Sequence, residues 1–303
     1  MIETLRYAFQ GTYTVRVAST FIDLLGQLWF YVATGVLLVA FLKLRFPRAL
    51  VPERLGRKGW VPVLLSVVLG AVSPIGTYAL IPLIATLLRT GTFPVAPLMG
   101  FLIASPLINP LLFMLTLGAF GPGMAVLRLA AAVVLGLSGA WLAHRLWKDG
   151  VPAGPAQAPL TAPTREPRLL TPRNFLLEVR KEGAFIGRVF LLSVLVAALT
   201  TVLIPADWVA RILGGHPGLS VFIAVLAGVP LYACGGGTIP VMEALMNMGM
   251  SKGAILAFFI SGPATKFSTL AALFACMPKK VVALYLGVTL TGAFLFGIIY
   301  NRF

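Results

Sequence analysis

Long apolar stretches fill most of the chain, and short stretches rich in polar residues or helix breakers separate them. Apolar helical segments are predicted over residues 21–44, 60–90, 93–120, 122–147, 183–204, 218–248, 252–276 and 281–300. A membrane-spanning helix needs about 20 predominantly apolar residues, so most of these segments are long enough to cross a bilayer. The pattern predicts an all-α integral membrane protein.

A proline-rich polar stretch divides these segments into two sets. The sequence "KDGVPAGPAQAPLTAPTREPRLLTPRNF" is too polar to bury a core and predicts a flexible cytoplasmic linker over 148–174. The following "FLLEVRKEGAFIGRVF" places apolar residues beside a basic face, which predicts a helix at the membrane surface. We therefore expect an N-terminal segment over 1–20, a membrane repeat over 21–147, the linker, and a second membrane repeat over 175–303 that begins with this amphipathic helix.

The two membrane segments match each other when one is shifted by 158 residues. Gly70 then aligns with Gly228 and Pro82 with Pro240, and after a one-residue slip Pro106 aligns with Pro263. Glycine and proline each fix a backbone feature rather than merely filling an apolar helix. The shared positions therefore indicate an internal duplication.

Equivalent loops of the two repeats differ in charge. The loop "KLRFPRALVPERLGRK" holds six Lys or Arg residues, whereas its partner "IPADWVARILGGHPG" holds one. Loops rich in Lys and Arg stay in the cytoplasm, so these equivalent loops should face opposite sides of the membrane. This predicts inverted repeats, which need an odd number of crossings each. The alternative is four full spans in each of two parallel repeats.

Helix breakers interrupt two apolar segments of each repeat. The breaks at "SPIG" and "PLYACGGGT" leave arms of about 13 residues, too short to span, which predicts a re-entrant helical hairpin in each repeat. A second break follows at "ASPLINP" and "SGPATKFS", inside stretches long enough to cross, which predicts a broken transmembrane helix in each repeat. The two hairpin tips and the two broken spans are expected to meet at a pseudo-twofold axis.

These breaks hold the candidate site. Non-helical backbone at membrane depth needs protein or a water-filled cavity to satisfy it, and transporters bind substrate at such broken helices. The glycines beside Cys234 expose amides that favour negative or electron-rich groups. The candidate substrate-binding or translocation residues are Pro74, Gly76, Thr77, Tyr78, Ser105, Pro106 and Asn109 in the first repeat, and Cys234, Gly235, Gly236, Gly237, Thr238, Glu243, Ser261, Pro263, Thr265 and Lys266 in the second.

Several candidates also have a structural interpretation. Cys234 could be a small core residue, and the short polar groups at the breaks could satisfy freed backbone. Lys266, which stands where the first repeat has Asn109, is a functional candidate because it is ionisable at membrane depth, or it is paired structurally with Glu243. If transport is coupled to a gradient, Lys266 and Glu243 are the groups most able to exchange a proton.

The methionines and cysteines are candidate soft ligands. Met242 and Met246 share a helix face with Cys234 and could offer sulfur ligands, although packing is the usual role of methionine. Cys234 and Cys276 are the only cysteines, so one chain cannot build a four-cysteine metal site. We expect neither a metal centre nor a cofactor.

Composition and charge agree with a membrane protein. The chain has 303 residues, of which 59% are hydrophobic and 11% charged, and a mean hydropathy of +0.95. Cytoplasmic loops account for the net charge of +15, so no nucleic-acid partner is expected. Arg16 and Asp23 interrupt the N-terminal apolar stretch, so no removable signal peptide is expected, and Asp23 is expected to be solvated.

Both repeats resemble the predicted permeases that include the organoarsenical efflux permeases, often called the ArsP family. The pattern is a breaker, a proline some eight residues on, a glycine, an apolar run and a second proline break. Here it reads "SPIGTYALIPLIATLLRTG" with "GFLIASPLIN", and "YACGGGTIPVMEALMNMG" with "AFFISGPATK". The family's first hairpin typically reads Pro-x-Cys-Ser-Cys-Gly. Residues 74–79 of this chain hold no thiol, and in the second repeat only Cys234 falls on a cysteine position.

The residues and the resemblance together predict a multi-pass inner-membrane permease, not an enzyme, that moves a small solute outward by alternating access. The resemblance implies a trivalent organoarsenical or another soft, thiol-reactive species or metal. A small anion is the alternative, favoured by the glycine amides and Lys266. The expected partners are the solute and the lipid bilayer, and assembly into a homo-oligomer is left open.

Two other classes of membrane protein fit the sequence less well: a thiol oxidoreductase and a nucleotide-driven pump. A membrane thiol oxidoreductase would use Cys234 and Cys276, but such enzymes use a Cys-x-x-Cys pair, which neither cysteine has. A nucleotide-driven pump is disfavoured because the chain has no GxxxxGK[ST] stretch.

Overall fold

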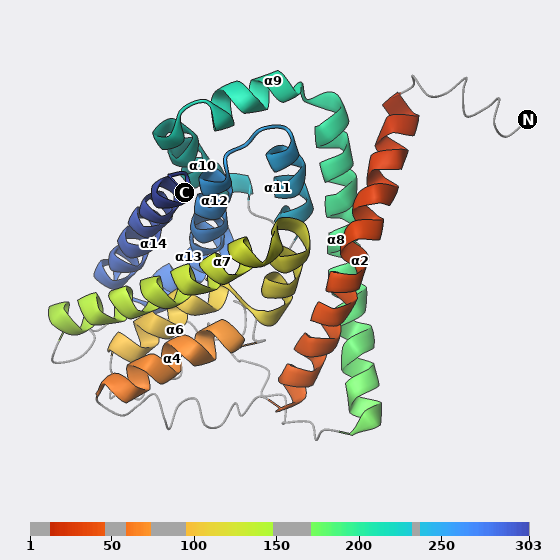
Figure 1. The fold of residues 1–303 in the computed structure, drawn as a ribbon. Coiled ribbons are helices and arrows are strands. Elements are labelled where there is room, and N and C mark those ends of the chain that lie inside the picture. Colours follow the sequence, from red (N-terminus) through yellow and green to blue (C-terminus); the bar gives the residue numbers. More distant parts are fainter. Residues whose placement is uncertain (1–12, 46–58, 74–94, 148–170, 232–236, 303) are drawn as a thin grey trace, which may run out of the picture.

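The computed structural model describes residues 13–45, 59–73, 95–147, 171–231 and 237–302, and all regular structure in these ranges is helical. The first half holds α2 (Tyr13–Arg45), α4 (Trp60–Val72), α6 (Val95–Leu107) and α7 (Pro110–Leu146) (Figure 1). The second half holds α8 (Pro172–Leu203), α9 (Ala206–Val209), the π-helical turn η1 (Ala210–Gly214), α10 (Pro217–Leu231), α11 (Thr238–Asn247), α12 (Lys252–Thr265), α13 (Phe267–Cys276) and α14 (Lys279–Tyr300). The predicted all-α class is confirmed.

Several of the helices are suited to a membrane. Four of those described, α2, α7, α8 and α14, are long and apolar enough to cross it, and a fifth span arises if 206–214 and 218–228, bent by 104°, count as one. The chain is therefore a multi-pass membrane protein. The apolar helices α4 and α6 have 13 residues each, about two thirds of a span.

The helices of the two halves begin and end at related positions. Helix α6 ends at Leu107 and α12 ends at Thr265, one residue off the 157-residue offset. Within α7, Gly121 has a non-helical backbone (φ 80°, ψ 177°). The residue 157 positions later is Pro278, which lies between α13 and α14. Helix α7 therefore corresponds to α13 and α14 taken together. Its break at Gly121 lies between the predicted segments 93–120 and 122–147.

Equivalent helices also make equivalent contacts. A Cβ added to Gly70 of α4 would lie 3.1 Å from Cβ of Ala104 and 3.3 Å from N of Ser105. A Cβ added to Gly228 of α10 would meet Oγ of Ser261 and lie 3.0 Å from N of Gly262, at the positions 157 residues after Ala104 and Ser105. Glycine permits close approach of the two helices in each half.

Helices α2 and α8 form an antiparallel pair beside the other helices (Figure 1). Nζ of Lys43, near the end of α2, lies 2.5 Å from Oε1 of Glu182 and 3.9 Å from Oε1 of Glu178, near the start of α8. The segment predicted to lie on the membrane surface forms the first part of α8, which runs unbroken from Pro172. Its acidic residues pair with Lys43, so this segment lies alongside the end of α2.

Two predicted boundaries differ from the structure. Helix α2 begins at Tyr13, inside the N-terminal segment expected over 1–20, because Arg16 and Asp23 lie on its exposed side and do not interrupt it. Helix α8 begins at Pro172, inside the expected linker, because the Thr171 hydroxyl caps it by accepting a hydrogen bond from N of Asn174. The rest of the linker lies outside the described residues.

Candidate translocation site

Helix breaks are present at both of the positions predicted by "ASPLINP" and "SGPATKFS". Between α6 and α7, Pro110 has no N–H to continue the helix, and Oδ1 of Asn109 caps α7 by accepting a hydrogen bond from N of Leu112 at 2.9 Å. Between α12 and α13, Lys266 has an extended backbone (φ −51°, ψ 130°), and its carbonyl accepts hydrogen bonds from N of Thr269 and Leu270. The two breaks thus occupy equivalent positions of the two halves.

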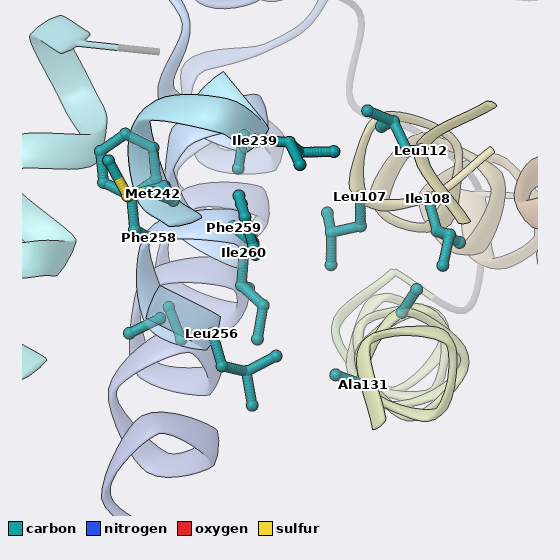
Figure 2. Close-up of a cluster of buried hydrophobic side chains, with 14 of the residues drawn as sticks. Leu107, Ile108, Leu112, Ala131, Ile239, Met242, Leu256, Phe258, Phe259 and Ile260 are labelled. Atoms are coloured by element: carbon teal, nitrogen blue, oxygen red, sulfur yellow. The ribbon is translucent and has the colours of Figure 1, made fainter. Parts of the chain in front are cut away.

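The break of the first half faces the second half. Leu107 and Ile108 at the end of α6 lie opposite Ile260 of α12 and Ile239 of α11 (Figure 2). All four side chains are at most 1% exposed. A layer of buried apolar side chains therefore separates the two halves at this level.

The candidates of the first repeat are partly described. Ser105 is buried on α6, and Pro106 lies inside the same helix, half-buried. Asn109 has its capping role. The remaining candidates, Pro74, Gly76, Thr77 and Tyr78, lie outside the described residues.

In the second repeat, the described candidates lie along α11 and α12. Thr238 begins α11 and is buried, as are Ser261, Pro263 and Thr265 on α12. The hydroxyl of Thr265 donates to the carbonyl of Ser261 at 2.8 Å, whereas Oγ of Ser261 has no hydrogen-bond partner among the described residues. Lys266 is half-buried and Gly237 caps α11. Cys234, Gly235 and Gly236 lie outside the described residues.

Met242 illustrates the choice between ligand and packing. Its side chain is 5% exposed and lies beside Phe258 in the core (Figure 2). Met246 also packs against the core. Both positions fit the packing interpretation. Within the described part of the chain, no three His, Cys, Asp or Glu residues come together as metal ligands.

Glu243 has a partner that the sequence did not suggest. Its side chain on α11 is 2% exposed, and its Oε1 accepts a hydrogen bond of 2.6 Å from Nε2 of Gln27 on α2. Its second oxygen, Oε2, is buried and has no hydrogen-bond partner among the described residues. Glu243 therefore joins the α2 and α8 pair to the candidate site and keeps one oxygen available for a further ligand.

Arg128, which the sequence analysis did not single out, lies at the break of the first half. Its side chain on α7 is 1% exposed, Nε donates to the carbonyl of Leu107 at 3.2 Å, and NH1 donates to Oγ1 of Thr116 at 2.8 Å. The guanidinium carbon also lies 4.4 Å from the ring centre of Phe259 on α12. One buried side chain thus contacts the end of α6, the start of α7 and the other half of the protein.

The physical reason for this arrangement is the interrupted helix. The last carbonyls of a helix have no partner within it and carry partial negative charge, so a guanidinium at the end of α6 is favourable. The second half has Tyr285 in the equivalent position (128 + 157 = 285), 1% exposed, with no hydrogen-bond partner for its hydroxyl among the described residues. The rule that singled out Lys266, an ionisable group within an apolar segment, would also have found Arg128.

A sequence model of predicted permeases matches residues 15–302 of this chain. The chain belongs to this predicted permease family. Membrane transport is therefore the class of function to which it is assigned, rather than an enzymatic reaction, and the resemblance noted in the sequence is confirmed.

The permease is also similar to a UPF0718 protein of Methanocaldococcus jannaschii. The two are 26% identical over 115 residues, which is 38% of this chain and 32% of the relative, so the match spans about a third of the relative's length. No solved structure matches the chain.

Proposed function

We propose that this permease exports a small solute across the inner membrane by alternating access between two inverted repeats. In this mechanism the two halves rock about the apolar layer at the facing breaks, exposing the site first to one side and then to the other. The observation that carries the proposal is a helix break at equivalent positions of the two halves, with the first break facing α11 and α12 of the second half (Figure 2).

The direction of α2 and α8 supports inversion. The two helices are equivalent, because Tyr13 at the start of α2 aligns with Thr171, directly before α8, at the 158-residue offset. They run antiparallel, with Lys43 beside Glu178 and Glu182. Repeats related by an axis along the membrane normal keep equivalent helices parallel, whereas inverted repeats reverse them. The short helices α4, α10 and α11, none longer than 15 residues, support hairpins that enter and leave on one side.

We infer that the solute is a trivalent organoarsenical or another soft, thiol-reactive species or metal. Cys234 is the thiol at the predicted hairpin tip, and soft ions and arsenic(III) prefer thiolate ligands. A small anion is the second candidate, favoured by the half-buried Lys266 at the helix break after α12.

The substrate class can be tested by transport into everted membrane vesicles. Vesicles that contain the permease are supplied with methylarsonous acid, arsenite, cadmium or phosphate, and accumulation is measured by mass spectrometry. Accumulation of methylarsonous acid that falls at least tenfold in Cys234→Ser supports the thiol-dependent site. Accumulation of phosphate that is unaffected by Cys234→Ser and lost in Lys266→Met supports the anion carrier instead. If none of the four solutes accumulates, the proposed substrate classes are wrong.

Cys276→Ser is the matched control. Cys276 lies at the end of α13, outside the sequence of the predicted hairpin. A permease should transport normally without it, whereas a thiol oxidoreductase that uses both cysteines should lose its activity.

A further inference from the structure

Helix α2 carries a stripe of polar residues along a single face. Successive members are three or four positions apart, which keeps them within an arc of roughly 80° at 100° per residue. The polar stripe consists of Arg16, Thr20, Asp23, Gln27, Tyr31 and Thr34. After Thr34 the same face becomes apolar with Leu38 and Phe41, so the stripe extends only part of the way along the helix.

The polar stripe lies between two apolar faces of α2. On one side, Leu24 and Leu28 are buried against the rest of the protein. On the other side, Ile22 and Trp29 are 64% and 58% exposed, as expected for residues that face lipid. Within the stripe, Asp23 and Gln27 are exposed rather than covered by protein. Carboxyl and amide groups facing hydrocarbon are costly, so their exposure is best explained by contact with water.

The stripe meets a buried carboxyl. Gln27 donates its amide hydrogen to Glu243, whose other oxygen is buried without a partner among the described residues. Asp23 precedes Gln27 by one helical turn, about 6 Å along the axis. Further along the stripe, Tyr31 packs against Gly118 of α7. The stripe therefore follows the seam between α2 and the core helices and reaches Glu243.

We propose that this stripe is a water-accessible path from the outer side of the membrane to Glu243, and that Glu243 takes up the proton that drives export. The inference rests on the proposed function. The end of α2 near Lys43 leads into the basic loop 43–58, which is assigned to the cytoplasm, so the end with Asp23 faces outward. Protons moving inward through Glu243 would then be exchanged for the exported solute.

A proton fits this site better than a metal ion does. One available carboxylate oxygen and one amide fall short of the six or more oxygen ligands that calcium needs, or the octahedral set that magnesium needs. In the described residues no group of acidic, histidine and cysteine side chains gathers there to supply the rest. A proton needs one acceptor, which Oε2 of Glu243 provides.

The helices packed around α11 carry few other ionisable groups. Away from the helix ends these are Asp23 and Tyr31 on α2, Arg128 on α7, Arg188 on α8 and Lys266 after α12. From the antiparallel contacts of Lys43, the part of α8 level with Gln27 lies near Val196, among apolar and hydroxyl side chains.

The path can be tested by the reactivity of single cysteines in a protein that lacks Cys234 and Cys276. A charged, membrane-impermeant thiosulfonate reacts only where water reaches the thiol. Added from outside, it should modify Asp23→Cys, Gln27→Cys and Tyr31→Cys at least tenfold faster than Ile22→Cys, Trp29→Cys and Leu37→Cys, which lie on the exposed apolar face. Equal rates on the two faces, or no reaction on the stripe, would overturn the path.

The proton site can be tested with dicyclohexylcarbodiimide, which attaches to protonated carboxyl groups in apolar surroundings. In right-side-out vesicles with a fixed inner pH, the adduct on Glu243 should increase at least threefold when the outer pH falls from 8 to 6. Glu178 and Glu182, which pair with Lys43, should stay unmodified and serve as internal controls. No adduct on Glu243, or one that ignores the outer pH, would overturn the proposal. Neither measurement uses the exported solute, so each can fail while the transport assay succeeds.

Discussion

Replacing Arg128 should show whether this side chain holds the break between α6 and α7 in place. Arg128→Met keeps much of the side-chain length and removes both donors and the charge. The carbonyl of Leu107 then loses its donor, and an unsatisfied buried group costs about 1 to 3 kcal/mol. Loss of the desolvated contact with Phe259 costs about 2 kcal/mol more, partly offset because a charge is no longer buried. We expect the free energy of unfolding to fall by about 2 to 4 kcal/mol.

Lysine at the same position should be no better than methionine. The lysine ammonium would also be charged at this buried position, where Arg128 is 1% exposed. It lacks the planar guanidinium whose two nitrogens donate to both Leu107 and Thr116. A buried charge that loses its partners costs about 3 to 5 kcal/mol, so Arg128→Lys should destabilise at least as much as Arg128→Met. Stability is measured by denaturant unfolding in detergent micelles, followed by tryptophan fluorescence.

Arg145→Met on the same helix is the matched control. Arg145 also lies over an aromatic ring, with its guanidinium carbon 5.1 Å from the ring centre of Trp141, but it is exposed. Its replacement should cost less than about 1 kcal/mol. If Arg128→Met unfolds like Arg145→Met, or if Arg128→Lys is as stable as the unmodified protein, Arg128 does not hold the break as described.

Three further predictions follow from the site and the packing. In a cysteine-less background, a cysteine at residue 55 should react with an impermeant reagent from inside and one at residue 214 from outside; reaction of both from the same side would refute the inverted repeats. Gly228→Ala should destabilise the protein by about 1 to 3 kcal/mol because its methyl group meets Ser261 and the Gly262 backbone, whereas Gly218→Ala, with open space around it, should not, as unfolding in detergent would show. Lys266→Met should abolish transport in the vesicle assay while the protein stays folded in the membrane, and adding Glu243→Gln should leave transport lost; normal transport by the double variant would make Lys266 structural.

Much of the helical framework follows from the sequence because breakers act locally. Proline removes a backbone donor, and glycine tolerates conformations that other residues avoid, so the breaks near Pro110 and Gly121 lie where these residues predict them. The 13-residue length of α4 likewise follows from the "SPIG" break. Equivalent ends in both halves reflect the duplication already visible in the shared glycines and prolines.

The side-chain partners of the site could not be predicted in the same way. The bond between Gln27 and Glu243 joins residues 216 positions apart and depends on how α2 packs beside α11. In the sequence, Arg128 is one of many basic residues in a chain of net charge +15. Its role follows from its contacts with the end of α6 and with Phe259, which the sequence does not give. The packing of the first part of α8 beside α2 depends on the pairing of Lys43 with Glu182, which is equally non-local.

The most direct test of alternating access is the two-sided reactivity of one thiol at the second helix break. Thr265 is 3% exposed and ends α12 beside the second break, so Thr265→Cys in a cysteine-less protein reports on the site itself. Alternating access predicts that an impermeant thiol reagent modifies this cysteine from outside in right-side-out vesicles and from inside in everted ones. Modification from one side only would contradict the proposed mechanism.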